Sequence, residues 1–365
     1  KAKNKLGSAS LKFLVDWNGK KAQSTTSLSV RPAIPYMTDL KMGMISSSSE
    51  KIDVDRKMYD EYRQLSVGAS ILPMTFAQAL MNYLEKYPYG CTEQVISKGF
   101  PTLVLSNLKG FDVDHKILES SYASVIATLR KRQSSTGGFG LWDTTPSSFD
   151  FHSLYAIHYL IESKARGFRE GDDLLNRGMD YLKSRTYEKA DDLHQTRLWA
   201  YSLYLQARND FVPKRSLEEL RGILDSKFAN RWKNDLTGIY LAGTYALIQK
   251  SEEGEKIIRA YKSSDKGEFN WNFFYDKSIR ETQYLYIAGN HYPDELKYLK
   301  SEDFLAMLEP LTKGSYTTTN SSYVILGLDA FIRAQGHHGQ SVHNVEVSEI
   351  LKDSENKLQL KGGLF

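Results

Sequence analysis

The stretch Leu198-Trp199-Ala200-Tyr201-Ser202-Leu203-Tyr204-Leu205 is apolar or aromatic at all but one position, which is typical of a helix buried on every side. Similar stretches recur about every 40–45 residues, a spacing typical of two-helix repeats. Amphipathic segments such as 174–185 and 217–228 come before them. We predict a mainly α fold, a closed α/α toroid of six helical hairpins with the apolar second helices inside, and an open superhelix is the alternative. The other apolar segments are 91–108, 151–157, 239–247, 281–288 and 321–328.

Both ends of the chain have the alternating pattern of β-strands. Leu11–Trp17 precedes an Asn18-Gly19 turn, and further strands are predicted at 27–31, 41–45, 51–55, 65–67, 345–347 and 357–360. We therefore predict a β-domain in residues 1–70 that resumes in residues 341–365, with the helical domain inserted at 71–340. The sequence begins without Met or a signal peptide, so we expect a fragment of a longer protein whose β-domain is completed beyond Phe365.

The composition excludes several classes of protein. The chain has 365 residues with 48 Lys and Arg against 44 Asp and Glu, and these charges are interspersed, so nucleic acid is not an expected partner. No apolar run approaches the roughly 20 residues that cross a bilayer. Cys91 is the one cysteine, and it cannot form an intrachain disulfide. A lone cysteine is usually an inert buried residue, so its neighbours must decide its role.

Those neighbours favour acyl chemistry. Cys91 and Gln94 are three residues apart, so on a helical turn their side chains face each other. Loss of ammonia would join the sulfur to the Gln94 carbonyl as a thioester, which an amine or a hydroxyl can attack. Pro88 and Gly90 favour a helix that begins near Cys91, and the amides of a helix start favour a thiolate.

A thioester also needs protection from water, and the residues around it are candidates. Tyr87 and Tyr89 are the nearest candidates for such a shield, although both could be ordinary core or interface aromatics. For Glu93, inside the same segment, we expect only a favourable acidic start to the helix.

The run Tyr87-Pro88-Tyr89-Gly90-Cys91-Thr92-Glu93-Gln94 resembles the thioester signature of the alpha-2-macroglobulin and complement family, especially its bacterial members. The familiar animal signature has Gly where this chain has Thr92. Residues 29–36, and 137–140 with Trp142, also resemble segments of bacterial members. The resemblance covers essentially the whole chain, and it implies an α/α toroid inserted in a β-sandwich of CUB type.

The resemblance also implies a function. In that family a protease cuts a bait region elsewhere, the thioester becomes exposed, and a Lys amine of the protease attacks the Gln carbonyl. This chain would then be part of a single-use inhibitor and not an enzyme, with target proteases and the other domains of the parent chain as its partners. No cofactor or metal is expected. The resemblance to bacterial members implies a periplasmic or cell-envelope location.

The same resemblance makes histidines candidates for acyl transfer, because complement proteins use a His to pass the acyl group to hydroxyls. If the inner helices run parallel, His152 and His194 lie near the rim that carries Cys91. His194 precedes the same helix as the family's His, but aligning that helix puts the family position near Tyr187. A surface or capping role for His194 therefore stays open, and we expect amines to be the main attacking groups. We predict a core role for His158 and a solvated loop for His337, His338 and His343.

Two other functions remain open at this stage. Glycosidases with an α/α toroid use paired carboxylates, and Asp172-Asp173 and Asp191-Asp192 are such pairs, although both resemble helix starts. The chain could also be a helical-repeat binding module with an inert Cys91. Only the thioester explains a Gln three residues after the cysteine.

Overall fold

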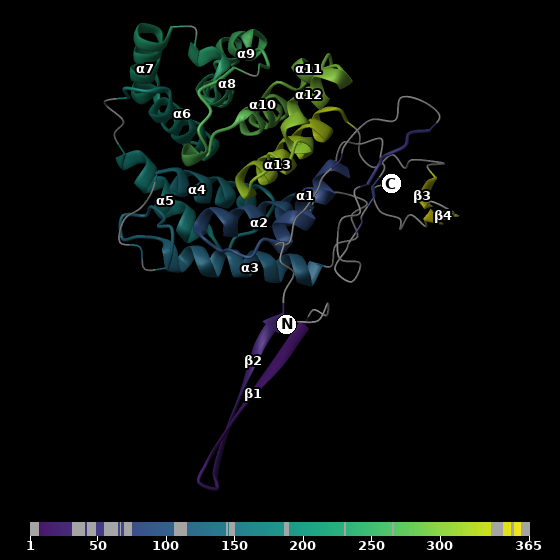
Figure 1. Ribbon diagram of the computed structural model, residues 1–365. Coiled ribbons are helices and arrows are strands. Elements are labelled where there is room, and N and C mark those ends of the chain that lie inside the picture. The colour runs from purple at the N-terminus through teal and green to yellow at the C-terminus, as the bar shows by residue number, and fades with distance from the viewer. Residues whose placement is uncertain are drawn as a thin grey trace. The chain divides into compact units, whose positions relative to one another are not determined.

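The structure is a computed structural model that divides into two compact units, residues 1–39 and 40–365, which are described separately. It describes residues 7–30, 41, 49–54, 65, 67–68, 75–105, 115–143, 145, 150–185, 190–229, 231–264, 266–336, 346–351 and 354–358. Helices account for most of these residues, as predicted (Figure 1). No helix within the described ranges is long and apolar enough to cross a membrane.

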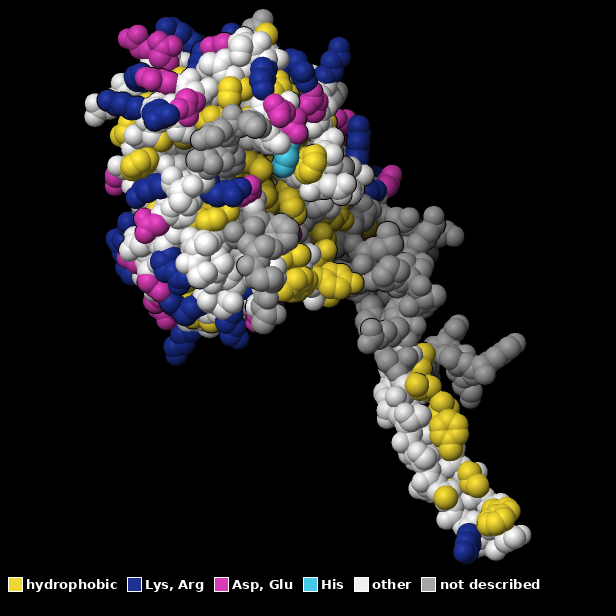
Figure 2. Space-filling model, turned by 90° about the vertical axis from the view of Figure 1, so that its left-hand side faces the viewer, with side chains coloured by type: hydrophobic (Ala, Val, Ile, Leu, Met, Phe, Trp, Pro, Cys, Tyr) yellow, Lys and Arg dark blue, Asp and Glu magenta, His cyan; other side chains and the backbone are white. Residues whose placement is uncertain are grey.

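The first unit contains one antiparallel hairpin, β1 (Gly7–Trp17) and β2 (Lys20–Val30). Asn18 and Gly19 join the strands with φ angles of 49° and 78°, the left-handed pair that a two-residue type I′ turn requires. The predicted strands at 11–17 and 27–31 are confirmed by this hairpin, although both are longer than expected. One face of β1 carries a row of exposed apolar side chains (Figure 2), namely Leu11, Phe13, Val15 and Trp17.

The second unit contains a short hairpin of β3 (Val347–Leu351) and β4 (Ser354–Leu358). These strands overlap the predicted segments at residue 347 and at residues 357–358, whereas residue 346 is not in a strand. The prediction for 51–55 is wrong at residues 51–54, which are exposed and in no strand, and residues 65 and 67 are not in a strand either. Most of the 41–45 segment lies outside the described residues. Each hairpin is a separate two-stranded sheet, so the predicted β-sandwich stays a prediction.

The helices of the second unit form a closed ring. Six inner helices contact one another in succession, and the last contacts the first, so the open superhelix is excluded (Figure 1). The inner helices are α2 (Thr92–Leu105), α4 (Asp150–Ala165), α6 (Leu193–Arg208), α8 (Leu236–Leu247), α10 (Lys277–His291) and α13 (Thr318–Ala334).

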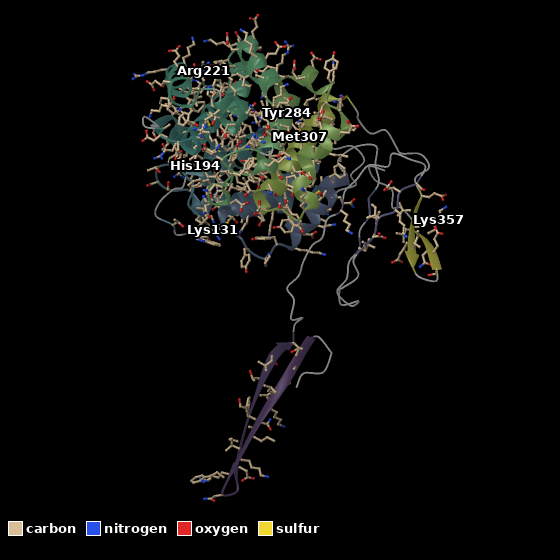
Figure 3. All side chains as sticks on the ribbon, turned by 45° about the horizontal axis from the view of Figure 1, so that its top comes forward. Lys131, His194, Arg221, Tyr284, Met307 and Lys357 are labelled. Carbon is tan, nitrogen blue, oxygen red and sulfur yellow. The ribbon has the colours of Figure 1, made fainter. Side chains whose placement is uncertain are left out.

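Each inner helix is preceded by a more exposed partner, which completes the six predicted hairpins. These partners are α1 (Thr75–Lys86), α3 (His115–Arg132), α5 (Asp172–Ser184), α7 (Lys214–Ile223), α9 (Ser251–Ala260) and α12 (Ser301–Thr312). Shorter helical turns connect them at Leu224–Phe228, Arg231–Asn234, Trp271–Phe273 and α11 (Pro293–Leu296). Met307 of α12 shows the amphipathic pattern, because it is buried while its neighbours on the other side of the helix are exposed (Figure 3).

All six inner helices run in the same direction, so their starts form one rim of the ring and their ends form the other. At the starts, which we call the N-terminal rim, side chains cap the free backbone amides: Asp192, Asp235, Asp276 and Thr317 each accept a hydrogen bond from the first turn of their helix. Phe151 of α4 stacks on Phe274, just before α10, which shows that these helix starts meet.

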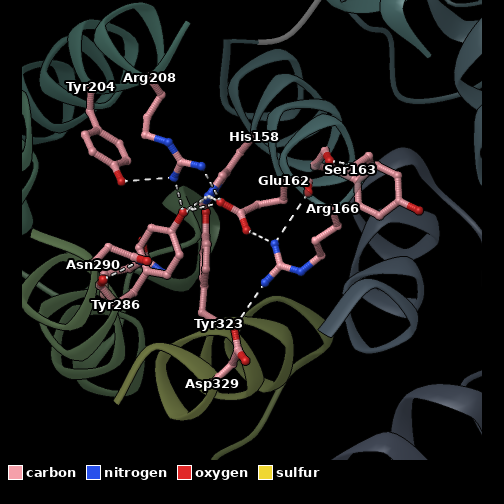
Figure 4. Close-up of polar contacts among 12 residues, drawn as sticks. His158, Glu162, Ser163, Arg166, Tyr204, Arg208, Tyr286, Asn290, Tyr323 and Asp329 are labelled. Carbon is pink, nitrogen blue, oxygen red and sulfur yellow. Dashed lines mark hydrogen bonds and ion pairs between the residues drawn. The ribbon is translucent and has the colours of Figure 1, made fainter. Parts of the chain in front are cut away.

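The ends of the inner helices, which we call the C-terminal rim, enclose a buried ionic cluster (Figure 4). Glu162 of α4 forms ion pairs with Arg166 and with Arg208 of α6, the latter at 2.9 Å. Arg166 also pairs with Asp329 of α13 at 3.0 Å, so this cluster joins three inner helices. Tyr286 of α10 donates a hydrogen bond to Glu162 at 2.5 Å.

Candidate functional site

The start of α2 carries Cys91 at the position where a helix-capping residue normally lies. The Cys91 carbonyl accepts the first helical hydrogen bond, from Val95 N–H at 2.9 Å, while its own side chain stands outside the helix. The buried hydroxyl of Thr92 donates to the carbonyls of Gly140 and Leu141 at 2.6 and 3.1 Å. The predicted helix start is therefore confirmed, and the loop at 137–142 holds it in place.

Gln94 folds back onto Cys91. Its Oε1 accepts a hydrogen bond from the Cys91 backbone N–H at 2.9 Å. This is the reciprocal half of a capping box, in which a side chain in the third helical position reaches the residue before the helix. The Gln94 side-chain carbonyl is thereby held next to the residue that carries the thiol, as the spacing of three predicted.

The pKa of the Cys91 thiol is set by two opposing effects. Cys91 is half-buried, and burial raises the pKa of its thiol; the nearby Glu93 carboxylate acts in the same direction. Hydrogen bonds from the backbone N–H groups of Gln94 and Glu93, together with Arg132, lower that pKa but do not outweigh burial. The amides of the helix start thus favour the thiolate, as predicted, but desolvation of the charged form is the larger effect and the pKa of the thiol is raised.

Glu93 has a larger role than the favourable helix start that we predicted. It is 4% exposed, and its carboxyl oxygens accept hydrogen bonds from Ser97 at 2.7 Å, from Thr318 at 2.8 and 2.9 Å and from Thr319 at 2.8 Å. Thr318 and Thr319 begin α13. Glu93 therefore fastens the first inner helix to the last, at the point where the ring closes.

A pocket of about 390 Å³ lies beside Gln94. Its walls come from the start of α2, the start of α10 and the start of α13, together with the end of α1. Five of the lining residues are aromatic and two are acidic, and none is Lys or Arg. The lining residues are Tyr83, Tyr87, Glu93, Gln94, Phe274, Tyr275, Asp276, Ile279, Tyr316, Thr317, Thr318 and Thr319.

The two predicted shielding residues differ in position. Tyr87 lines the pocket with Gln94, and its ring contacts Tyr83 at a centroid distance of 5.7 Å. Tyr89 contacts Tyr87 at 5.7 Å but is 64% exposed. Both tyrosines thus lie near the motif, only Tyr87 shares a pocket with Gln94, and their role as a shield stays a prediction.

The segment before α10 contributes residues that the sequence did not single out. Phe274 has a φ of 50°, unusual for a residue with a side chain, and its ring lies flat on Phe151 at 4.2 Å. Asp276 caps α10, and Tyr275 lines the same pocket. An Asp directly before a helical pattern predicts a helix cap. The sequence does not predict that Asp276 shares a pocket with Gln94, because the two residues are far apart along the chain.

The histidines are distributed around the N-terminal rim and the core. His194, in the first turn of α6 (Figure 3), stacks on Phe273 at 4.0 Å, and burial lowers its pKa. Within the described ranges no hydrogen bond or ring contact joins His194 to Cys91 or Gln94, and α4 lies between α6 and α2 in the ring. Its role in acyl transfer stays a prediction.

Two other histidines are core residues. The ring of His152 lies edge-on to both Phe151 and Phe274, and burial lowers its pKa to about 4. His158 is fully buried, with its ring nitrogens 2.7 and 3.0 Å from the hydroxyls of Tyr201 and Tyr286, so the predicted core role is confirmed. The cluster His337, His338 and His343 lies outside the described residues.

The acidic pairs that suggested a glycosidase belong to two separate helix starts. Asp172 and Asp173 lie in the first turn of α5, where Asp173 pairs with Arg130. Asp192 caps α6, and Asp191 pairs with Lys227 at 3.0 Å. Both pairs have the helix-start role that the sequence predicted, which removes the observation on which the glycosidase alternative depended.

The closed ring of six hairpins defines an α/α toroid with a Cys-Gln pair at the start of an inner helix. Alpha-2-macroglobulin of Rickettsia conorii is 30% identical over 382 residues, covering 99% of this chain and 20% of that protein. A structure of Salmonella alpha-2-macroglobulin reacted with methylamine matches with a TM-score of 0.58 and 17% identity, over 97% of this chain and 24% of that one.

A structure of Escherichia coli alpha-2-macroglobulin activated by porcine elastase matches 76% of this chain and 25% of that chain, with 18% identity and a TM-score of 0.50. No family model matches the sequence. The chain belongs to the bacterial alpha-2-macroglobulin family, a family of protease inhibitors. It spans about a fifth of the length of the Rickettsia relative.

Proposed function

We propose that Cys91 and Gln94 form an internal thioester, in which Cys91 Sγ is bonded to the Gln94 side-chain carbonyl carbon. The observation that carries this proposal is the 2.9 Å hydrogen bond from Cys91 N–H to Gln94 Oε1, which holds the amide against the cysteine before any bond forms. Ring closure needs the two groups in a near-attack position, and a preformed contact lowers its entropic cost. Ammonia leaves as the carbon–sulfur bond forms.

The reaction that follows is a single acyl transfer. An amine nitrogen bonds to the Gln94 carbonyl carbon, the bond from that carbon to Cys91 Sγ breaks, and the sulfur leaves with the electron pair and gains a proton. The product is a stable amide and a free thiol, so the site acts once. A relative from Salmonella has been studied after reaction with methylamine, which supports amines as the attacking class.

At the level of the whole protein we propose a covalent protease trap. Cleavage of a bait region elsewhere in the parent protein would expose the thioester to a lysine of the protease, in agreement with a family relative activated by elastase. A periplasmic or cell-envelope location belongs to the same proposal. So does a discontinuous β-domain of residues 1–70 and 341–365.

The test is the state of Cys91 in gently purified native protein. A thioester predicts an intact mass short by one ammonia and no titratable thiol. Addition of methylamine should release one thiol per chain and add one methylamine to the mass. A full mass together with immediate titration of Cys91 in freshly isolated, folded protein would contradict the proposal and favour an inert cysteine.

Gln195 provides a matched control for Gln94. It also stands in the third position of an inner helix, and its Oε1 accepts a hydrogen bond from Asp191 N–H at 2.9 Å, but no cysteine is present there. Gln94→Asn should leave Cys91 titratable from the start, because the shortened side chain cannot reach the sulfur. Gln195→Asn should keep the thiol masked until methylamine is added.

A further inference from the structure

The pocket beside Gln94 has a composition that the thioester alone does not explain. Its walls are built largely from aromatic rings, and its charged members are the carboxylates of Glu93 and Asp276. An aromatic enclosure with negative charge is the usual protein environment for an alkylammonium group, because the ring faces and the carboxylates both attract a cation. The aromatic members are Tyr83, Tyr87, Phe274, Tyr275 and Tyr316.

The carboxylates in this pocket are satisfied by neutral groups. Asp276 accepts from Ile279 N–H at 2.8 Å and from the side-chain amide of Asn320 at 3.0 Å. Among the residues that the structure describes, the donors to Glu93 are all hydroxyls. No ion pair within the described ranges includes either residue, whereas the buried carboxylate of Asp235 on the same rim is paired with Arg197 at 2.9 Å.

Burial changes the ionisation of both carboxyl groups. It raises the pKa of Asp276 and the pKa of Glu93, and their hydrogen bonds only partly offset this effect. A carboxylate with a raised pKa gains more from a nearby cation and accepts a proton more readily than an exposed one. Asp276 is the less buried of the two, so it is better placed to meet a group that enters from solvent.

We propose that this pocket binds the protonated amine of the attacking lysine and that Asp276 accepts its proton. This inference rests on the proposed thioester and names the group that selects the nucleophile. The ammonium transfers one proton to the Asp276 carboxylate and becomes a neutral amine. The amine then attacks the Gln94 carbonyl carbon, the carbon–sulfur bond breaks, and the second proton of the amine passes to the sulfur of Cys91.

The experiment compares two nucleophiles on the intact protein at neutral pH. Methylamine is almost entirely a cation there, whereas hydroxylamine is mostly uncharged and needs neither the cage nor the proton acceptor. The rate of thiol release from Cys91 is measured against the concentration of each. Asp276→Asn should slow methylamine about tenfold or more and change hydroxylamine less than about threefold, which corresponds to at least 0.7 kcal/mol of selective loss.

Two further measurements separate recognition from folding. Asp192→Asn makes the same change at the helix cap of α6, outside the pocket, and should leave both rates unchanged. Tetramethylammonium, which has no N–H group to react, should slow methylamine by occupying the pocket and should spare hydroxylamine in the unmodified protein.

The outcomes distinguish the two proposals. Wild-type protein that releases no thiol with either nucleophile would remove the thioester and this inference together. Wild-type protein that reacts with both, combined with an Asp276→Asn variant slowed equally for both, would overturn only the inference, because Asp276 would then support the structure of the rim. Failure of tetramethylammonium to protect against methylamine would likewise overturn it.

Discussion

The two rims of the toroid handle buried charge in different ways. On the C-terminal rim Glu162 is surrounded by Arg166 and Arg208, and although burial opposes ionisation these arginines hold the pKa of Glu162 well below its usual range. On the N-terminal rim, Glu93 and Asp276 face a pocket and their pKa values are raised. Helix starts favour anions and helix ends favour cations, which agrees with Glu93 and Asp276 on one rim and with the arginines around Glu162 on the other.

The difference is whether the charges are neutralised within the ring. The C-terminal rim supplies its own counter-ions and connects α4, α6 and α13 into one ionic cluster (Figure 4). The pocket of the N-terminal rim leaves two carboxylates without an ion-pair partner among the described residues. Removing one member of a closed cluster of this kind destabilises a fold, whereas an open pocket with unneutralised charge is typical of a functional site.

The largest expected effect comes from breaking the C-terminal rim. Glu162→Gln would leave Arg208 and Arg166 with less negative charge in a buried cluster, so we expect the free energy of unfolding to fall by about 3–5 kcal/mol. Denaturant unfolding measures this change. Glu219→Gln is the control, because the exposed Arg215–Glu219 pair should contribute less than about 1 kcal/mol.

The same variant tests whether the two rims are independent. In conditions where Glu162→Gln remains folded, thiol release by methylamine should match the wild-type rate, because Glu162 lies at the opposite ends of the helices from Cys91. A large rate change in folded protein would show that the C-terminal rim controls the site.

The next largest effect is expected from a fall in pH, which should lower the free energy of unfolding through two buried histidines. Burial, together with the charge of Arg208, lowers the pKa of His291 from 6.5 to about 4 and that of His158 to about 3, and Glu162 only partly offsets this. Because the unfolded chain binds these protons first, the stabilisation is complete above pH 6.5 and decreases as the pH falls toward 4. Each buried histidine contributes a slope of up to about 1.4 kcal/mol per pH unit.

The comparison of wild-type protein with His291→Gln isolates this slope. The variant should lose less stability than the wild type between pH 6.5 and 5 in denaturant titrations. Equal slopes would show that His291 titrates normally. Asp276 and Glu93 have the opposite effect on stability. Their pKa values are raised in the folded state, so as the pH falls the folded state binds these protons before the unfolded chain does, and this favours folding.

The smallest effect is expected at the ring closure. Glu93→Gln keeps the shape of the side chain but replaces an oxygen that accepts from Thr318 with an amide that donates. We expect the free energy of unfolding to fall by about 1–2 kcal/mol. Glu119→Gln on the exposed face of α3 should change it by less than about 0.5 kcal/mol. A neutral result for Glu93→Gln would mean that other contacts hold α2 to α13.

Sequence reasoning recovered the features that depend on local pattern. The all-round apolar segment at 198–205 and its repeats predict buried inner helices, and the Cys91–Gln94 spacing predicts two side chains on one helical turn. Both follow from the period of the helix. The predicted strand at 51–55 is absent at its described residues. Five alternating residues form a strand only when a neighbouring strand pairs with them and a core covers their apolar side chains.

The missed features all depend on contacts between distant parts of the chain. Glu93 was assigned a helix-start role because its partners Thr318 and Thr319 are 225 and 226 residues away. Asp276 was not singled out because its pocket exists only where three helix starts meet. For the Cys91 thiol the sequence predicted the effect of the helix-start amides, but it did not predict the larger effect of burial, because burial depends on the packing of distant segments.

The closure of the ring through Glu93 has a consequence for the order of events in synthesis. The pocket beside Gln94 takes one wall from the first hairpin and another from residues 316–319 of the last, so the ribosome must synthesise the four intervening hairpins before the pocket is complete. An unfinished chain has Cys91 and Gln94 without the hydroxyls that fix Glu93. Formation of the proposed thioester is therefore tied to completion of the domain, and a truncated chain ending before α13 would leave Cys91 without the complete pocket.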